Sequence, residues 1–178
     1  PRIRLTGTGF VVADGKKVVT NYHVIAPVLS STGNQTYVVL SGTGSAIKMH
    51  SITQTKTAPA YDLAVLSIDN ALPTVRLADA AMAVEGTEVA FTGFPITQVL
   101  GLYPATHRGI ISAITPIATP ADNSTQLQAA ALRRLQQPYM VYQLDATAYP
   151  GNSGSPLYDT ASARVIGIIN MVHVKSIR

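Results

Sequence analysis

Hydrophobic and polar residues alternate along most of the chain, which is the period-two pattern of β-strands. The apolar runs are short and are separated by clusters of Gly, Ser, Asn, Asp and Pro that favour turns. Short strands at such close spacing predict an all-β protein built as an antiparallel barrel or sandwich. The runs expected to form strands are 8–12, 17–20, 36–40, 46–53, 63–68, 87–92, 106–114, 140–145 and 165–174.

A specific turn signal joins the first two runs. Residues 8–12 and 17–20 are separated by Ala13-Asp14-Gly15-Lys16. Asp-Gly between two β-rich runs favours a tight hairpin, because both turn positions take a positive φ. We therefore expect Asp14 and Gly15 to turn the hairpin, and His23 to follow the end of its second strand.

Residues 70–85 have little strand pattern and contain Pro73. A segment with turn residues and little periodic pattern is typical of a connection between two folding units. We place a boundary near residue 83. The first predicted unit is then residues 1–83, and the second is residues 84–178.

Residues 122–137 depart from the β pattern in a different way. Asp122-Asn123-Ser124 favours a helix N-cap, and Pro138 would end the helix. We expect a short helix in an insertion of the second unit. Its apolar stripe is thin, which favours packing against that unit over docking of a partner protein. The stripe consists of Leu127, Ala131 and Leu135.

The composition narrows the class of protein. With 178 residues, 47% of them hydrophobic and 12% charged, the chain can bury a core and does not resemble a disordered protein. No apolar run reaches the roughly 18 residues of a membrane-spanning helix. The net charge of +4 is carried by dispersed basic residues, which favours a solvated surface over nucleic-acid binding. The absence of cysteine excludes disulfides, thiolate metal sites and a Cys nucleophile.

Three residues with complementary chemistry occur in the order His23, Asp62, Ser153. Asp62 directly precedes an apolar run, which predicts a carboxylate held at the edge of a core. An imidazole at the end of a strand can take a hydroxyl proton near neutral pH, and a carboxylate can orient it. The three residues predict a Ser-His-Asp catalytic triad.

The sequence around Ser153 is the most specific part of the chain. Gly151 allows the backbone to approach an oxyanion, Gly154 relieves crowding behind the serine, and Pro150 and Pro156 stiffen the loop. Alone, a Gly-x-Ser-Gly tetrapeptide would favour an ordinary turn. The presence of two qualified partners elsewhere in the chain favours a nucleophile instead.

These motifs resemble those of trypsin-like (chymotrypsin-fold) serine peptidases, and most of all the bacterial high-temperature-requirement or Deg-type protease domains. All three triad positions match. The segments that carry the resemblance are Thr8–Val12, Val19–Val24, Asp62–Leu66, Gly93–Pro95, Gln143–Ala146, Pro150–Leu157 and Val165–Ile168.

The resemblance implies two perpendicular six-stranded antiparallel β-barrels with the active site in the cleft between them. His23 and Asp62 would come from the first barrel and Ser153 from the second. The N–H groups of Gly151 and Ser153 would form the oxyanion hole, and the segment Ile168–Asn170, with Ile169 at its centre, would pair with the substrate backbone. The implied activity is endopeptidase cleavage of proteins or peptides through an acyl-enzyme, without a cofactor. Relatives of this kind are often trimers, and the implied location is periplasmic or secreted.

The chain also departs from the family pattern. Ser155 stands where glycine is usual, and the stretch 114–139 is longer than a plain connection. Trypsin-like enzymes that cleave after Lys or Arg carry an aspartate six positions before the nucleophile, and here that position is Thr147. We therefore expect cleavage after small or medium apolar residues, with a pocket shaped by Thr147 and the segment from Ile168 to Asn170.

Other classes fit the sequence less well. An α/β-hydrolase would need glycine at Ser155 and its Asp and His after the serine. A phosphate loop is not supported, because Gly42–Lys48 lacks the Gly-Lys-Ser/Thr ending. The alternative that stays open is a catalytically silent binding or scaffold domain of the same fold. No metal is expected, because the other histidines lack acidic partners at ligand spacing, and His107 is the one nearest to the expected cleft. These histidines are His50, His107 and His173.

Overall fold

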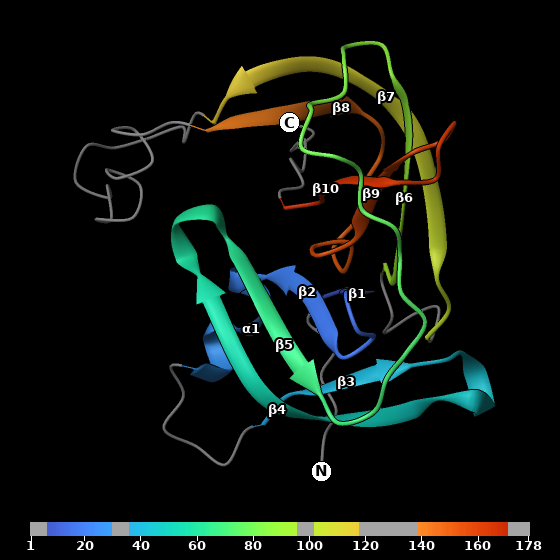
Figure 1. Cartoon of the computed structure of the whole chain (residues 1–178). Helices are drawn as coiled ribbons and strands as arrows, with labels where there is room; N and C mark the ends of the chain where they lie inside the picture. The colour runs from blue at the N-terminus through green and yellow to red at the C-terminus, as the bar shows by residue number, and fades with distance from the viewer. Residues whose placement is uncertain (1–6, 30–35, 96–101, 118–138, 171–178) are drawn as a thin grey trace, which may run out of the picture.

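The computed structural model describes residues 7–29, 36–95, 102–117 and 139–170, which form two curled antiparallel sheets (Figure 1). The first sheet has the strand order β1-β2-β5-β4-β3, and the second has the order β10-β9-β6-β7-β8. The strands of the first sheet are β1 (Phe10–Val12), β2 (Lys17–Asn21), β3 (Val38–Ser41), β4 (Lys48–Ala58) and β5 (Leu63–Ile68). Those of the second sheet are β6 (Glu88–Gly93), β7 (Ala105–Pro116), β8 (Met140–Asp145), β9 (Pro156–Asp159) and β10 (Val165–Ile168).

The predicted all-β class with two antiparallel sheets is confirmed. Within the described ranges each sheet has five strands, where six were expected. The first sheet takes its strands from residues 10–68 and the second from residues 88–168. The boundary near residue 83 stays a prediction, and the helix expected at 122–137 lies outside the described residues.

The period-two pattern produces these strands because one face of each sheet is buried. In β2, Val18 and Thr20 point into the first half of the molecule, and β5 pairs with β2 in a continuous antiparallel register from Lys17↔Ser67 to Asn21↔Leu63. The first core consists of Val18, Val24, Ile25, Ala64, Leu66 and Ile68. The second core consists of Val89, Phe91, Ile111, Leu157 and Ile169.

Two elements differ from the sequence expectation. Helix α1 (Tyr22–Leu29) follows β2 directly and was not predicted, because it is short and contains Pro27. Its Val24 and Ile25 are buried in the first core, so packing stabilises a helix that the local sequence does not favour. Strand β9 was also missed, because it is short and lies between turn residues.

The first hairpin forms as predicted, but its turn differs. Val12 pairs with Lys17, so four residues make the connection. Positive φ angles occur at Ala13 and Gly15, and not at Asp14. The Asp14 carboxylate instead accepts a hydrogen bond from the N–H of Lys16 at 2.9 Å. The four-residue connection is as predicted, but the expectation of a positive φ at Asp14 was wrong, because the Asp14 side chain caps the turn while φ of this residue is not positive.

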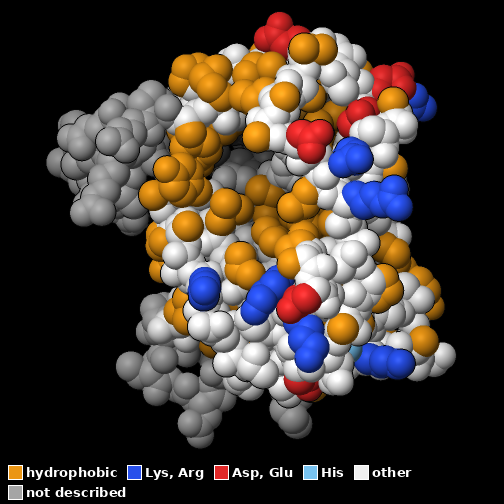
Figure 2. All heavy atoms as spheres, in the orientation of Figure 1, with side chains coloured by type: hydrophobic (Ala, Val, Ile, Leu, Met, Phe, Trp, Pro, Cys, Tyr) orange, Lys and Arg blue, Asp and Glu red, His pale blue; other side chains and the backbone are white. Residues whose placement is uncertain are grey.

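The surface between the two sheets is hollowed. Figure 2 shows hydrophobic side chains gathered in and around a hollow between the upper and lower halves, while charged side chains lie mainly at its periphery. The described part of the chain contains no helix with the length and apolar character needed to cross a membrane.

Adjacent isoleucines on β7 allow a matched test of the second core. Ile111 is fully buried, whereas Ile110 is 39% exposed. We expect Ile111→Ala to lower the free energy of unfolding by about 2–5 kcal/mol, because it removes buried methylenes and leaves a cavity. The control Ile110→Ala is expected to cost less than about 1 kcal/mol. Chemical denaturation of both variants checks this difference, and equal costs would contradict the described sheet orientation.

Candidate active site

His23 and Asp62 meet at the edge of the first sheet. His23 lies in the first turn of α1, and Asp62 directly precedes β5. The Nδ1 atom of His23 is 2.7 Å from Oδ2 of Asp62, and the backbone N–H of His23 donates to Oδ1 at 2.8 Å. Both carboxylate oxygens are therefore engaged by one residue. This geometry fixes the ring orientation and leaves Nε2 directed away from the carboxylate.

The backbone around Asp62 explains why the carboxylate is so well placed. Asp62 follows the 3₁₀ turn η2 (Pro59–Tyr61) and has the left-handed conformation, with φ 52° and ψ 41°. Non-glycine residues adopt this conformation uncommonly, and Asp is one of the few that tolerate it. Here the Asp62 N–H donates to the Pro59 carbonyl at 3.1 Å, and the Asp62 carbonyl accepts the N–H of Tyr22 at 3.0 Å and the Asn21 side chain at 3.1 Å.

Burial differs sharply between the two partners. The side chain of Asp62 is 10% exposed, whereas that of His23 is 48% exposed. A shielded carboxylate interacts strongly with its partner, and an exposed imidazole can be reached by another molecule. The arrangement can therefore move a proton at His23 Nε2.

Ser153 is held against the first sheet by the segment that leads into β1. The Thr8 N–H donates to the Ser153 carbonyl at 2.8 Å, and the Thr8 hydroxyl donates to the Gly151 carbonyl at 2.7 Å. The same hydroxyl accepts the N–H of Phe94 at 3.0 Å, and the Thr8 carbonyl accepts the Thr20 hydroxyl at 2.7 Å. Thr8 thus joins β2, the end of β6 and the loop of residues 149–155, which we call the nucleophile loop after the predicted nucleophile Ser153.

The space around Gly7 shows that the nucleophile loop lies close to α1. A Cβ atom at Gly7 would be 2.7 Å from a methyl group of Val24 and 2.9 Å from the Ser153 carbonyl oxygen. Val24 is the residue after His23. The backbone of Ser153 and the helix that carries His23 therefore lie on either side of one glycine. Sequence reasoning did not identify Gly7 or Thr8 as parts of the site, although Thr8 was in a segment that carried the family resemblance.

The nucleophile loop also depends on close backbone contacts. A Cβ atom at Gly154, where φ is +88°, would collide with the carbonyl oxygen of Thr8. A Cβ atom at Gly151, where φ is +101°, would collide with the carbonyl oxygen of Phe94. Both glycines are thus required by backbone conformation and by space, which agrees with the crowding predicted at Gly154, while the predicted approach of an oxyanion at Gly151 stays a prediction.

Two kinds of contact that the proposed chemistry would use are not formed in the described structure: the bond between Ser153 and His23, and bonds to the N–H groups of the loop. Between described residues, no hydrogen bond joins the Ser153 hydroxyl to His23. The N–H groups of Gly151 and Ser153 likewise have no hydrogen-bond partner among the described residues, while the neighbouring Asn152 N–H donates to the Tyr149 carbonyl at 3.0 Å. Hydrogen bonds of this kind often shorten only when a substrate is bound.

Asn152 and Ser155 lie on the inner side of the same loop. Both are fully buried, next to the backbone of Gly93. Their side-chain polar atoms have no hydrogen-bond partner among the described protein atoms. Ser155 is the residue that departs from the family pattern, and the structure directs it inward, away from the exposed side of the loop.

The predicted substrate-binding residues are spread around this loop. Thr147 is exposed, six residues before Ser153. Ile168 is the last residue of β10 and pairs with Pro156. Ile169 is buried in the second core, and its N–H and carbonyl already bond the Ser155 carbonyl and the Gly154 N–H at 2.9 and 2.8 Å. The backbone N–H and carbonyl of Ile169 are therefore already occupied within the protein and are not available to a substrate.

His107 lies beside the nucleophile loop, as its position in the sequence indicated. Its ring stacks on Phe91 at 5.1 Å between centroids and contacts Tyr149 at 5.7 Å. His50 is instead buried on β4, where Nε2 is 2.8 Å from the Ser41 hydroxyl. His173 lies outside the described residues. Within the described ranges, no group of three or more potential metal ligands is present.

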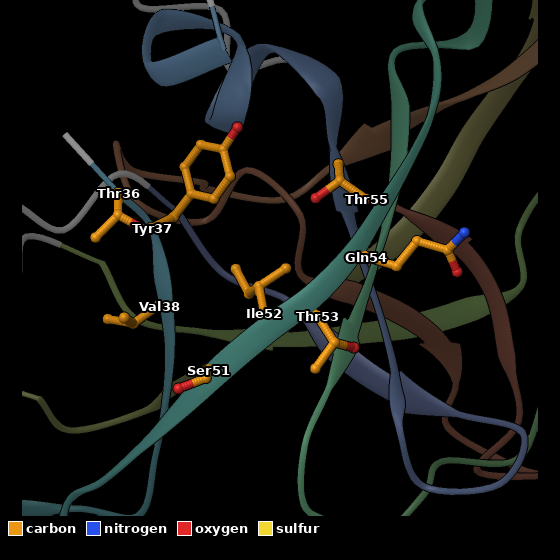
Figure 3. A pocket seen from close by; sticks show the side chains of 8 residues that line it. All are labelled: Thr36, Tyr37, Val38, Ser51, Ile52, Thr53, Gln54 and Thr55. Carbon is orange, nitrogen blue, oxygen red and sulfur yellow. The ribbon is translucent and has the colours of Figure 1, made fainter. Parts of the chain in front are cut away.

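A groove with a volume of about 380 Å³ lies on the first sheet, between the diverging ends of β3 and β4 (Figure 3). Partial burial, with a smaller contribution from Tyr22, raises the pKa of Tyr37, which lines this groove. None of the triad or loop residues lines it. We therefore assign no part of the active site to the groove. Its lining residues are Thr36, Tyr37, Val38, Ser51, Ile52, Thr53, Gln54 and Thr55.

Comparison with known proteins agrees with this geometry. The family model described as "Trypsin-like peptidase domain" matches residues 7–168. The chain is 31% identical over 175 residues to a protein of Halomonas elongata named "Probable periplasmic serine endoprotease DegP-like". The match covers 97% of this chain and 31% of that protein. It is 32% identical over 170 residues to "Serine protease Do-like HtrA" of Lactobacillus helveticus, which covers 93% of this chain and 35% of that protein. The chain spans about a third of the length of the curated relatives it matches.

Solved structures show the same fold. The structure titled "Crystal structure of Deg5" has a TM-score of 0.68 at 26% sequence identity, and the match covers 95% of this chain and 76% of that one. An inactive form of the Rv3671c protease of M. tuberculosis has a TM-score of 0.67 at 23% identity, with coverage of 96% and 71%. The second comparison supports the fold alone.

Two glycines with similar φ test the close approach at the nucleophile loop. Gly154 has φ +88° against the Thr8 backbone, whereas Gly86 has φ +83° with nothing within 4 Å of where a Cβ atom would stand. We expect Gly86→Ala to lower the free energy of unfolding by about 1–2 kcal/mol from backbone strain alone. Gly154→Ala is expected to cost more than about 3 kcal/mol, because a steric clash is added to the same strain. Denaturant unfolding measures both, and similar losses would contradict the packing of Thr8 on the loop.

Proposed function

The chain belongs to the trypsin-like peptidase family, and from this premise we propose that it is a serine endopeptidase domain of the HtrA/DegP type. The observation that carries the proposal is the pairing of His23 Nδ1 with the buried Asp62 carboxylate at 2.7 Å. A nucleophile loop with the expected glycines is held next to the same helix. The proposed substrates are proteins or peptides.

The proposed reaction proceeds through an acyl-enzyme. His23 Nε2 takes the proton of the Ser153 hydroxyl while Oγ attacks the substrate carbonyl carbon. The tetrahedral intermediate collapses when His23 gives that proton to the leaving amine and the C–N bond breaks. Water, deprotonated by His23, then attacks the acyl carbon, and the acid is released when the bond to Ser153 Oγ breaks and His23 returns the proton to Oγ. Asp62 keeps the proton-bearing Nδ1 fixed and stabilises the imidazolium that forms in each step.

We propose that the N–H groups of Gly151 and Ser153 bind the negative oxygen of the intermediate. Support comes from their lack of hydrogen-bond partners among the described residues, which leaves both donors available. Donors held in place before the reaction are worth about 10²–10³ in rate each. Closure of the Ser153–His23 contact on substrate binding would complete the site.

Cleavage after small or medium apolar residues is the proposed specificity. Thr147 places no carboxylate at the position that would select Lys or Arg, and Ile169 contributes an apolar side chain to the adjoining core. The Asn170 backbone is the proposed partner of the substrate backbone. Ile168 supports it at the end of β10.

A second candidate function is binding or scaffolding without catalysis. The observation that favours it is the lack of a hydrogen bond between Ser153 and His23 in the described structure. A hydroxyl that never reaches the imidazole would not be activated. The complete set of triad residue types favours the peptidase.

We further propose a periplasmic location and assembly into a homotrimer. The location is supported by the names of relatives in Halomonas elongata and Pseudomonas putida, which are called probable periplasmic serine endoproteases. The trimer is supported by the family resemblance alone. Analytical ultracentrifugation tests it, and a monomer at all concentrations would contradict it.

A fluorophosphonate probe separates the two candidate functions. We expect the wild-type protein to be labelled once, at Ser153, and Ser153→Ala to remain unlabelled. His23→Ala should label at least about 10²-fold more slowly, because general-base assistance is lost. Ser162→Ala, in an exposed turn, is the control and should label normally. A wild-type protein that is folded and never labelled would favour the silent domain.

The proposed specificity is tested with a peptide library and the variant Thr147→Asp. Wild-type cleavage should follow small or medium apolar residues. Thr147→Asp should raise cleavage after Lys or Arg at least about tenfold relative to apolar sites, because an added carboxylate binds the substrate cation. Thr160→Asp, another exposed threonine, serves as the control for added charge. Wild-type cleavage that is dominated by Lys or Arg sites would contradict the proposal.

A further inference from the structure

An aromatic contact connects the turn of Asp62 to the second sheet. Tyr61, the residue before Asp62, contacts Tyr139 with ring centroids 5.3 Å apart and ring planes inclined by 54°. Tyr61 ends η2, between β4 and β5, whereas Tyr139 directly precedes β8. Figure 1 shows the β4–β5 connection facing the start of β8 across the space between the sheets. The two rings therefore join the halves that contribute the base and the nucleophile.

Tyr61 is not held by burial in its own half. Its side chain belongs to the exposed hydrophobic residues, at 54% relative exposure. The ring therefore packs against the other sheet instead of the first core. Tyr61 is the residue next to Asp62, so its contact with Tyr139 links the Asp62 turn to the second sheet.

The partner ring is attached to a well-fixed point. The carbonyl of Tyr139 accepts the N–H of Ile117 at 2.9 Å, and Ile117 is buried. This bond extends the antiparallel pairing of β7 and β8, which reaches Pro116↔Met140. At its other end β8 leads through Asp145 towards Thr147 and the nucleophile loop. A displacement of Tyr139 relative to the second sheet is thus opposed by the pairing of β7 with β8.

We propose that Tyr61 is a positioning residue, which holds the Asp62 turn in register with the second sheet through its contact with Tyr139. This inference rests on the proposed peptidase function for its kinetic consequence, although the contact itself does not. Hydrogen bonds to neighbouring residues of the first half hold Asp62 in its left-handed conformation. Tyr61 adds an aromatic contact between the Asp62 turn and the second sheet. Loss of the ring would remove this contact and leave the Asp62 carboxylate less well aligned with His23 Nδ1.

Another tyrosine separates this role from general packing between the halves. Tyr103 is 59% exposed, and its hydroxyl lies against the first-sheet residue Gly44, at 2.9 Å from where a Cβ atom would stand. Tyr103 therefore also makes a contact between the two halves. Unlike Tyr61, it is not next in sequence to a residue of the candidate triad. Tyr103→Ala is therefore a matched control for the loss of an exposed aromatic ring between the halves.

The kinetic test compares Tyr61→Ala, Tyr61→Phe and Tyr103→Ala in peptide hydrolysis. Tyr61→Ala should lower kcat by roughly two- to tenfold, the factor that corresponds to one aromatic pair, with little change in KM. Tyr61→Phe should restore kcat because the ring contact is retained. Tyr103→Ala should leave kcat within about twofold of wild type. If Tyr61→Ala fails to fold, Tyr139→Ala removes the same contact from the other side and should give the same loss.

A second measurement does not require turnover. Proton NMR detects the Nδ1–H of His23 in its hydrogen bond to Asp62 as a low-field resonance. Tyr61→Ala should broaden or shift this resonance, whereas Tyr61→Phe and Tyr103→Ala should leave it at the wild-type position. An unchanged resonance in Tyr61→Ala together with an unchanged kcat overturns the inference. A wild-type protein that shows the resonance but neither hydrolyses peptides nor reacts with fluorophosphonate overturns the proposed function, and the resonance of Tyr61→Ala then still decides the positioning role.

Discussion

The whole arrangement depends on the passage of Gly7 and Thr8 between the two sheets. Thr8 uses its N–H, its carbonyl and its hydroxyl to bind Ser153, Thr20 and Gly151. Four hydrogen bonds at one residue, counting the Phe94 N–H, relate β2 to the nucleophile loop with little freedom. Without them Ser153 would lose the hydrogen bonds that set its loop against β2. The position of the loop is thus determined largely by Thr8, whose hydroxyl takes part in two of these bonds and whose backbone takes part in the other two.

The close packing of Thr8 and Phe94 against the loop explains why the loop combines glycines with buried polar residues. The carbonyl groups of Thr8 and Phe94 approach Gly154 and Gly151 too closely for any side chain. Asn152 lies between these glycines and has nowhere to project except inward, beside Gly93. Burial of its amide is unfavourable on its own. The same turn leaves the N–H groups of Gly151 and Ser153 without internal partners among the described residues, which adds to this cost.

The sequence predicted the parts of the fold that local patterns encode. The strands Leu63–Ile68 and Met140–Asp145 were predicted with their observed bounds, because alternation and turn residues define both ends. The meeting of His23 with Asp62 was also predictable from residue type and order. Helix α1 was missed because its stability comes from packing of Val24 and Ile25, and the roles of Gly7 and Thr8 were missed because they depend on contacts with residues more than 140 positions away. Such contacts leave no periodic trace in one sequence.

The two halves of the candidate triad are therefore assembled by different kinds of interaction. His23 and Asp62 are neighbours at the edge of one sheet, and their contact is fixed by hydrogen bonds among residues 21, 22, 23, 59 and 62. The contact of Ser153 with His23 instead depends on how one sheet is set against the other. A small relative movement of the sheets would open or close that contact while both hydrophobic cores stay intact. Control of the site consequently does not require unfolding of either sheet, and contacts that cross between the sheets are where such control would act.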